Sequence, residues 1–218
     1  MDKIRLLFSK TGKAKYISNL DLMATMRRAL LRAGIGLKYS EGFNPHPYMS
    51  VALPLPVGCG SECELMDIGV TSEKIDEGIP AAVTAMLPEG LAILGAYLPQ
   101  RKFSSIAWIE LSGVLYYDEG TPAGVVDKLS ELFNESCIII QKKTKSGISD
   151  IDIAPHVRNA KFFEDGEVTV KVTVSAQNPT INAENIMSAI KNYANPIAPD
   201  FALFTRREIY DSEMNVFR

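Results

Sequence analysis

The stretch Lys38–Val57, KYSEGFNPHPYMSVALPLPV, restricts the fold more than any other part of the 218-residue chain. It contains four of the twelve prolines and one of the two histidines. Proline fixes φ, lacks an amide donor and restrains the preceding residue, so FNPHP and ALPLP are incompatible with a helix interior or a central strand. We therefore predict a stiff loop that presents Asn44, His46 and aromatic rings at fixed angles, which is typical of a binding site.

Length and composition favour a globular protein of two domains. The chain is 46% apolar and 22% charged, and 218 residues suit two domains of roughly 100 residues each. No apolar run reaches the roughly 18 residues that span a bilayer, and MDKIRLLFSKTG is too interrupted for a signal peptide. We expect no membrane association and a cytoplasmic location.

The net charge of −3 hides an asymmetry along the chain. Residues 1–50 carry nine basic and three acidic residues, a net of +6, and the remainder carries 14 basic and 23 acidic residues, a net of −9. A basic first quarter predicts an anionic partner for that end of the chain, although exposed charge also serves for solvation alone.

The three cysteines do not form a disulfide framework. Cys59 and Cys63 have a C-x3-C spacing that could begin a metal site, and the further candidate ligands are Cys137, His46 and His156. Structural zinc and iron–sulfur sites usually need four ligands, so this set is too small and scattered. We predict free thiols, no metal site and no cofactor.

The first half alternates strand and helix patterns. The clearest helix, Asn19–Ala33, has Ser18 or Asn19 as its N-cap, apolar residues at helical spacing, and Gly34 as its terminator. The predicted order is strand Ile4–Phe8, this helix, strand Leu37–Tyr39, strand Glu64–Thr71, helix Glu73–Met86 and strand Leu91–Leu98. This β-α-β-β-α-β order is typical of a ferredoxin-like unit.

The second half repeats that order without repeating the sequence. We predict strands at Ile106–Tyr117, Cys137–Lys143 and Phe201–Tyr210, helices at Pro122–Glu135 and Asn182–Tyr193, and a hairpin of Val157–Phe163 with Val168–Val174. Lys145–Asp152 is predicted to be a polar connection. The fold class is therefore α+β, with two tandem ferredoxin-like (βαββαβ) units at residues 1–100 and 101–218.

Three segments resemble one bacterial family: FSKTGKAKYISNLDLM, RRALLRAGI and YSEGFNPHPYMSVALPLPVG. The family is known as radical-SAM-linked or radical-SAM-associated and has no established function. Its domain occurs alone or fused behind a cobalamin-binding radical-SAM protein, and its genes commonly lie near a ribonuclease of the E/G type and large-subunit ribosomal proteins. The resemblance thus implies a radical-SAM protein as partner, and RNA or a ribosomal partner.

Two departures bear on catalysis. Asn19 stands where the family pattern has His, and an amide cannot exchange a proton near neutrality. Radical-SAM chemistry needs C-x3-C-x2-C, and Met66 occupies the position of the third cysteine. We conclude that this chain is not itself a radical-SAM enzyme.

The basic residues and the aromatic residues of the first half suit RNA, because cations contact phosphates and aromatic rings stack on unpaired bases. Lys10 and Lys38 add to the positive charge of this region. The predicted binding surface comprises Lys13, Lys15, Tyr16, Arg28, Arg32, Phe43, Asn44, His46 and Tyr48. Aromatic and arginine side chains are also enriched at protein interfaces, so the sequence leaves a protein partner open.

We interpret the chain as a non-catalytic recognition or adaptor module that acts with a radical-SAM protein, with RNA-processing machinery, or with both. The alternative is an RNA-cleaving or RNA-modifying enzyme. In that alternative His46 is the general base, Tyr39 or Tyr48 the acid, and Lys13 or Lys15 the cation.

Overall fold

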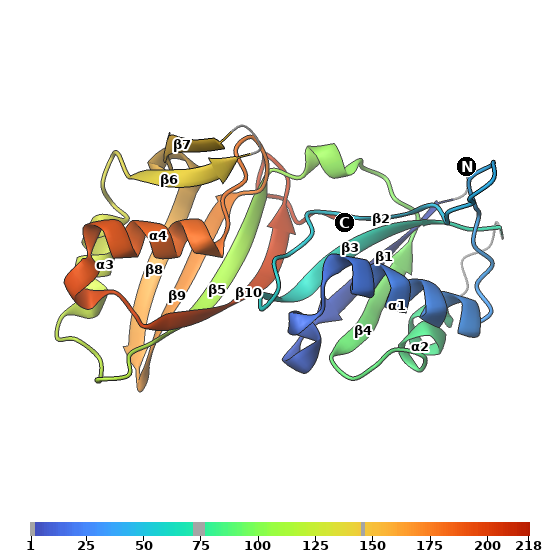
Figure 1. Ribbon diagram of the computed structural model, residues 1–218, viewed down its shortest axis with the longest axis horizontal. Helices are drawn as coiled ribbons and strands as arrows, with labels where there is room; N and C mark the ends of the chain where they lie inside the picture. The colour runs from blue at the N-terminus through green and yellow to red at the C-terminus, as the bar shows by residue number, and fades with distance from the viewer. Residues whose placement is uncertain (1–2, 72–76, 145–146) are drawn as a thin grey trace. The chain divides into compact units, whose positions relative to one another are not determined.

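The computed structural model describes residues 3–71, 77–144 and 147–218 as a mixed α+β protein with antiparallel strand pairs. The chain divides into two compact units (Figure 1). Unit 1 is Met1–Ser105 together with Arg218, and unit 2 is Ile106–Phe217. No α-helix among the described residues combines the length and the apolar character that crossing a bilayer requires.

Unit 1 is a four-stranded antiparallel arrangement in the order β4-β1-β3-β2. Its elements are β1 (Lys3–Lys10), the 3-10 helix η1 (Gly12–Tyr16), α1 (Asn19–Arg32), β2 (Met49–Val51), β3 (Gly60–Gly69), α2 (Ile79–Thr84), β4 (Leu91–Tyr97) and η2 (Phe103–Ser105). Helices α1 and α2 cover one face of this sheet (Figure 1).

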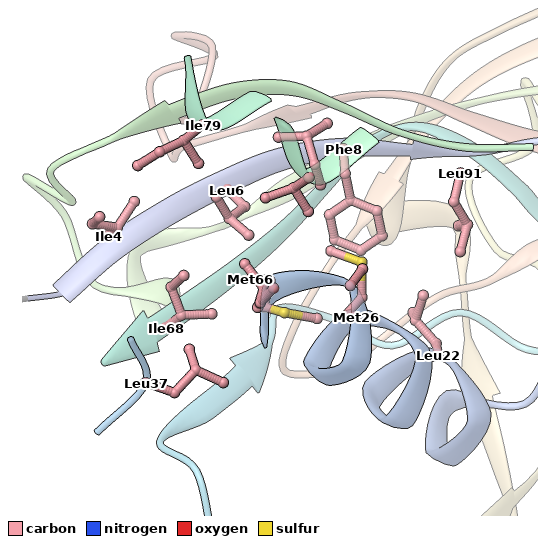
Figure 2. Close-up of a cluster of buried hydrophobic side chains, with 14 of the residues drawn as sticks. Ile4, Leu6, Phe8, Leu22, Met26, Leu37, Met66, Ile68, Ile79 and Leu91 are labelled. Carbon is pink, nitrogen blue, oxygen red and sulfur yellow. The ribbon is translucent and has the colours of Figure 1, made fainter. Parts of the chain in front are cut away.

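The core of unit 1 forms between that face and the helices (Figure 2). Leu6 and Phe8 of β1 meet Met26 of α1 and Met66 of β3, and all four side chains are fully buried. Burying a side chain of this size stabilises the fold by roughly 1.5–3 kcal/mol. Since successive strand residues alternate between faces, Arg5 lies on the face opposite this core.

Unit 2 contains a sheet in the order β10-β5-β9-β8 and a separate hairpin of β6 with β7. Its elements are β5 (Trp108–Tyr116), α3 (Val125–Leu132), β6 (Ile139–Thr144), β7 (Gly147–Asp152), η3 (Ala154–His156), β8 (Val157–Asp165), β9 (Glu167–Ser175), α4 (Ala183–Tyr193), η4 (Asn195–Ile197) and β10 (Phe201–Tyr210). Strand β5 alternates between buried and half-buried residues, as expected for a strand with one covered face.

Several predicted elements are present with the expected end signals. Helix α1 begins after Ser18, whose side chain accepts from the amide of Asp21, and Gly34 adopts φ +77 just beyond its end. Helix α4 has a capping box between Asn182 and Asn185. Gly166 joins β8 to β9 with φ +73. These are local hydrogen-bond and backbone requirements, which is why the sequence alone indicated them.

Three predicted elements differ. Leu37 and Tyr39 form only isolated bridges, and the second strand of unit 1 is Met49–Val51 instead. Helix α2 is confined to Ile79–Thr84, and residues 72–76 of the predicted helix lie outside the described residues. The predicted polar connection is wrong from Gly147 onward, because residues 147–152 form β7 on β6.

Candidate functional site

The lysines before α1 lie on a folded turn, not on a flexible loop. Thr11 donates its amide to the Gly90 carbonyl at 2.8 Å, Ala14 donates to Thr11 at 3.0 Å, and Ala14 is buried. Gly90 has φ +89, and a Cβ there would lie 2.4 Å from the Thr11 carbonyl oxygen. Helix η1 therefore presents Lys13 and Lys15 from a turn anchored in unit 1.

Tyr16 ends η1 as an exposed ring beside a cation. The Lys15 ammonium lies 5.2 Å from the centroid of the Tyr16 ring, and Tyr16 is 57% exposed. The far end of the proline-rich stretch meets this turn, since Gly58 donates its amide to the Lys15 carbonyl at 2.9 Å. Lys13 is exposed and Lys15 is half-buried.

Helix α1 presents arginines on its outer face. Leu22, Met26, Ala29 and Leu30 are buried, whereas Arg28 and Arg32, four residues apart, are exposed. Within the described residues neither arginine forms an ion pair. Arg32 in the last turn also complements the negative end of the helix. Both guanidinium groups can thus meet an anion outside the protein.

The first part of the proline-rich stretch, residues 38–48, is a loop whose two sides meet at an isolated bridge between Tyr39 and Pro47, and we call this segment the arm. Tyr48 donates its amide to the Lys38 carbonyl at 2.9 Å, and Ser40 donates to the His46 carbonyl at 2.8 Å. The His46 amide donates in turn to the Ser40 hydroxyl at 2.9 Å. The two sides of the arm are therefore joined by backbone hydrogen bonds, and the stiffness expected from its prolines stays a prediction.

The tip of the arm projects polar and aromatic groups into solvent. Phe43 has an exposed fraction of 112%, and Gly42 beside it has φ +113. Asn44 and the side chain of His46 are also exposed. At the base of the arm Tyr48 is 42% exposed, and its carbonyl accepts from the Gly69 amide at 2.7 Å.

The nine predicted residues therefore fall into three groups along α1. Lys13, Lys15 and Tyr16 lie at its start, Arg28 and Arg32 on the outer face of its second half, and the arm residues Phe43, Asn44, His46 and Tyr48 follow its end. A 14-residue helix is roughly 20 Å long. The first two groups therefore lie at different points along a helix of this length.

The predicted catalytic roles, with His46 as the base, have no support from hydrogen bonds among the described residues. Among the described residues the His46 ring forms no hydrogen bond. The two hydrogen bonds of this residue are made by its backbone amide and its backbone carbonyl. Catalysis by His46 stays a prediction.

Some charged residues of the first half are not on the surface. Lys10 is 2% exposed and Arg5 is fully buried, so neither can contact an external phosphate, which corrects the predicted contribution of Lys10. Arg5 binds Asp67 through two bonds, Nε to Oδ1 at 2.7 Å and Nη2 to Oδ2 at 3.0 Å. The sequence signal for this pair was a lone arginine inside the apolar run of β1.

The paired cysteines lie inside unit 1. Cys59 and Cys63 are both buried free thiols, and the Cys59 thiol donates to the Gly60 carbonyl. Cys137 in unit 2 is free and exposed. Across the described residues no three His, Cys, Asp or Glu side chains gather in a metal-binding arrangement.

Comparison with known proteins gives one family and, among other matching solved structures, two distant likenesses. The model of a family described as "Uncharacterized protein conserved in bacteria (DUF2344)" matches residues 3–184. No curated protein matches the chain. The chain is similar to a chain of the "Crystal Structure of a Cbf5-Nop10-Gar1 Complex", with 12% identity and a TM-score of 0.49, covering 96% of this chain and 48% of that one.

The second likeness is weaker. It is to the "Crystal Structure of an Unknown Protein from Galdieria sulphuraria", with 12% identity and a TM-score of 0.27, covering 94% of this chain and 98% of that one. The chain spans about half the length of the first structure's chain and nearly all of the second. Both TM-scores are low, and neither likeness carries an argument about function.

Proposed function

We propose that this chain, which belongs to the DUF2344 family of proteins conserved in bacteria, is a non-catalytic recognition module that binds single-stranded RNA through unit 1. The observation that carries this proposal is the joint exposure of cations and aromatic rings along α1 and the arm. Cations neutralise phosphates, and exposed rings stack on unpaired bases, so the two kinds of group together suit a single strand.

The exposure of the cations supports binding of a polyanion. Lys13, Arg28 and Arg32 are exposed along one helix and the turn before it, and Lys15 is half-buried beside them. Helix α1 carries three arginines and one acid, Asp21, which lies in its first turn. A chain of phosphates would therefore meet an excess of positive charge along α1.

The aromatic rings are held ready for stacking. Phe43 exposes its whole ring on a backbone-bonded arm, where leaving a phenyl group in water forgoes roughly 1.5–3 kcal/mol of burial free energy. Tyr16 and Tyr48 are about half exposed. Because the arm and η1 are fixed by hydrogen bonds, little ordering entropy is lost when bases stack on these rings.

Two finer predictions accompany the proposal. In unit 1, β4 pairs with β1, β1 with β3, and β3 with β2. In unit 2, with the β6–β7 hairpin left aside, β10 pairs with β5, β5 with β9, and β9 with β8, so the two units share one strand order. This order supports our proposal of two tandem ferredoxin-like units. A radical-SAM partner, for which the module would serve as an adaptor, stays a prediction based on the resemblance alone.

The test is the salt dependence of RNA binding, measured by fluorescence anisotropy of a labelled single-stranded RNA. Each neutralised phosphate of a single strand contributes about −0.7 to the slope of log K against log salt, so four cations predict a slope of about −3. The double variant Lys13→Gln/Arg28→Gln should reduce that slope to about −1.5. A DNA strand of the same sequence shows whether the 2′-hydroxyls matter.

The matched control is Lys161→Gln/Lys191→Gln, which removes two exposed cations of unit 2 and should leave the slope unchanged. Binding that is insensitive to salt would overturn the proposal, as would an equal loss in the control. Crosslinking and pull-down from the native cell gives an independent readout. Recovery of a protein without RNA would replace the RNA proposal with a protein-partner surface.

A further inference from the structure

Unit 2 contains a pocket that lies outside the RNA surface proposed for unit 1. Its volume is about 480 Å³, which lies within the roughly 300–1,000 Å³ of small-molecule sites. Three parts of unit 2 line it: the second half of α3 with the turn after it, Cys137 before β6, and the end of α4 with η4. The pocket is therefore formed by segments that are distant in the sequence.

The least exposed residues of the lining are apolar. Leu132 of α3 is 8% exposed and Ile197 of η4 is 5% exposed, and Ala194 and Pro196 lie beside them in the lining. Apolar atoms of a ligand would leave water against these side chains, which favours binding. The pocket thus offers an apolar surface of the kind that small-molecule sites use.

Tyr193 contributes its ring to the lining rather than its hydroxyl. The hydroxyl donates to the Ile139 carbonyl at 3.0 Å and accepts from the Ile139 amide at 3.0 Å, so both of its hydrogen-bonding roles are already taken. Tyr193 is nevertheless 52% exposed. The face of a tyrosine ring attracts a cation, and this ring is held against the start of β6 by the two bonds.

The charged residues of the lining have a negative net charge. Glu131 and Glu135 are exposed carboxylates four residues apart, and Lys128 is the one basic residue among the lining residues. Within the part of the chain that the structure describes, none of these three forms an ion pair. Unit 2 as a whole has a net charge of −6, which adds a long-range attraction for a cation.

Two helices also end at the pocket. Helix α3 ends at Leu132 and α4 ends at Tyr193, and both residues belong to the lining (Figure 1). The C-terminal end of a helix carries a partial negative charge, because its last carbonyl groups lack amide partners. In α4 the carbonyl groups of residues 191–193 accept no hydrogen bond from any described residue. Both helix ends therefore favour a cation where the carboxylates do.

We propose that this pocket binds a small organic cation, whose ammonium group lies among the Glu131 and Glu135 carboxylates and the Tyr193 ring while its compact apolar part lies against Leu132 and Ile197. The inference goes beyond RNA binding, because none of these residues belongs to the surface along α1 and the arm.

The exposed thiol of Cys137 is a reporter of occupancy, since it lines the pocket while Cys59 and Cys63 are buried. The experiment measures the rate at which iodoacetamide alkylates Cys137 in the full chain, by intact-protein mass spectrometry at neutral pH and constant ionic strength. The probes are benzylamine, its neutral analogue benzyl alcohol, and benzoate. Benzylamine at ten times its Kd should slow alkylation by about tenfold, because only about one pocket in eleven stays empty.

The two other probes and a second readout decide between outcomes. Equal protection by benzyl alcohol would reduce the site to an apolar pocket, and stronger protection by benzoate would reverse its charge preference, so either result overturns the proposal. Amide NMR shifts of residues 131–137 and 193–197 are followed in parallel. Shifts specific to benzylamine support the site even if the thiol stays reactive. The absence of both protection and shifts refutes it.

Substitutions test the charges. Glu131→Gln/Glu135→Gln should weaken benzylamine binding by about tenfold or more, since it removes hydrogen bonds between charged groups. The matched control is Glu164→Gln/Glu167→Gln, which removes two exposed carboxylates of unit 2 outside the pocket, and an equal loss there would refute the site. Lys128→Gln should tighten binding by up to about fivefold, because it removes a repelling charge. Weaker binding in Lys128→Gln would contradict the proposal.

The ring of Tyr193 is tested separately from its hydroxyl. Tyr193→Phe keeps the ring, so it should bind benzylamine within about twofold of the wild type even though the two bonds to Ile139 are lost. Tyr193→Leu removes the ring and should weaken binding by about twofold to fivefold. An equal loss in both variants would assign the effect to the hydroxyl and overturn the contact between the cation and the ring.

RNA binding distinguishes this inference from the proposed function. Glu131→Gln/Glu135→Gln should keep the RNA affinity of the wild type, and benzylamine should not displace RNA. Loss of RNA binding in this variant would merge the pocket with the RNA site and refute its independence. Benzylamine binding by a protein that fails to bind RNA would leave this inference standing alone.

Discussion

Unit 1 and unit 2 each join their first and third strands by a cross-strand ion pair, and the two pairs are built differently. In unit 1, Arg5 of β1 binds Asp67 of β3 at 2.7 Å, with side chains 1% and 13% exposed. In unit 2, Lys171 of β9 binds Glu110 of β5 at 3.0 Å, with side chains 56% and 16% exposed. The strands occupy the same positions in the two sheet orders, so burial is the main difference.

The comparison teaches that position in the fold does not determine what a charge does. The buried pair lies on the face of β1 opposite the core of unit 1, contacts Phe103 and orders the Arg101 backbone, whereas the exposed pair faces solvent. The units also differ in charge. The residues of unit 1, Met1–Ser105 and Arg218, include thirteen basic and ten acidic residues, a net of +3, and those of unit 2, Ile106–Phe217, include ten and sixteen, a net of −6.

Replacing the basic residue of each ion pair should give the largest difference in unfolding free energy between the two units. Arg5→Met should cost about 3–5 kcal/mol of unfolding free energy, because it leaves Asp67 as a poorly solvated charge. Lys171→Met should cost less than about 1 kcal/mol, because the pair is half exposed and screened by water. Urea denaturation followed by circular dichroism measures both values.

The control for this contrast is the double variant Arg5→Met/Asp67→Leu, in which no charge is left without its partner. It should recover most of the stability that Arg5→Met loses, since replacing both members of a buried pair is often close to neutral. Equal losses for Arg5→Met and Lys171→Met would contradict the distinction between the units.

A pair of exposed phenylalanines sharpens the functional contrast. Phe43→Ala should weaken binding of single-stranded RNA by roughly 5- to 150-fold, because one stacked base is lost. Phe163 on β8 of unit 2 is 51% exposed and serves as the matched position. Phe163→Ala should leave the affinity within about twofold, as measured by the anisotropy titration. A larger loss for Phe163→Ala would move the RNA surface to unit 2.

The smallest expected effect concerns a carboxylate of unit 2 that is held by backbone amides instead of a guanidinium. Asp152 accepts from the Ile138 amide at 2.8 Å and from the Ala154 amide at 3.0 Å, and these bonds lower its pKa from 3.8. Because the folded-state pKa is lowered, the stabilisation is present above pH 3.8 and is lost as the pH falls through the lowered value.

Asp152→Asn should therefore destabilise the protein slightly at neutral pH, and its difference from the wild type should shrink below pH 3.8. Thermal unfolding at a series of pH values measures this. Asp150→Asn, which changes an exposed carboxylate on the same strand, is the control and should show no such pH dependence. A stability difference between Asp152→Asn and the wild type that grows as the pH falls would contradict the assigned role of the two amide bonds.

The elements that the sequence predicted correctly are those that neighbouring residues stabilise, through caps, apolar spacing and turns. Helix α1 follows from its cap at Ser18 and its apolar spacing, and the β8–β9 hairpin follows from a turn with Gly166. Strand β7 had no such signal, because its residues are mostly exposed and polar, and it forms only by pairing with β6. Met49–Val51 was missed for the same reason, since β3 supplies its hydrogen bonds.

The candidate site divides in the same way. Sequence alone determined which residue types the first half offers and that prolines stiffen the segment carrying Phe43 and His46. Tertiary structure alone decided which of those residues reach solvent, because Lys10 and Arg5 lie in strand β1 and are buried while Arg28 and Arg32 stand on an uncovered helix face. It also brought Glu131 and Glu135 together with Tyr193, far apart in sequence, around one pocket. The preference of a segment for helix, strand or turn depends on neighbouring residues. Exposure and long-range contact depend on what the rest of the chain packs against.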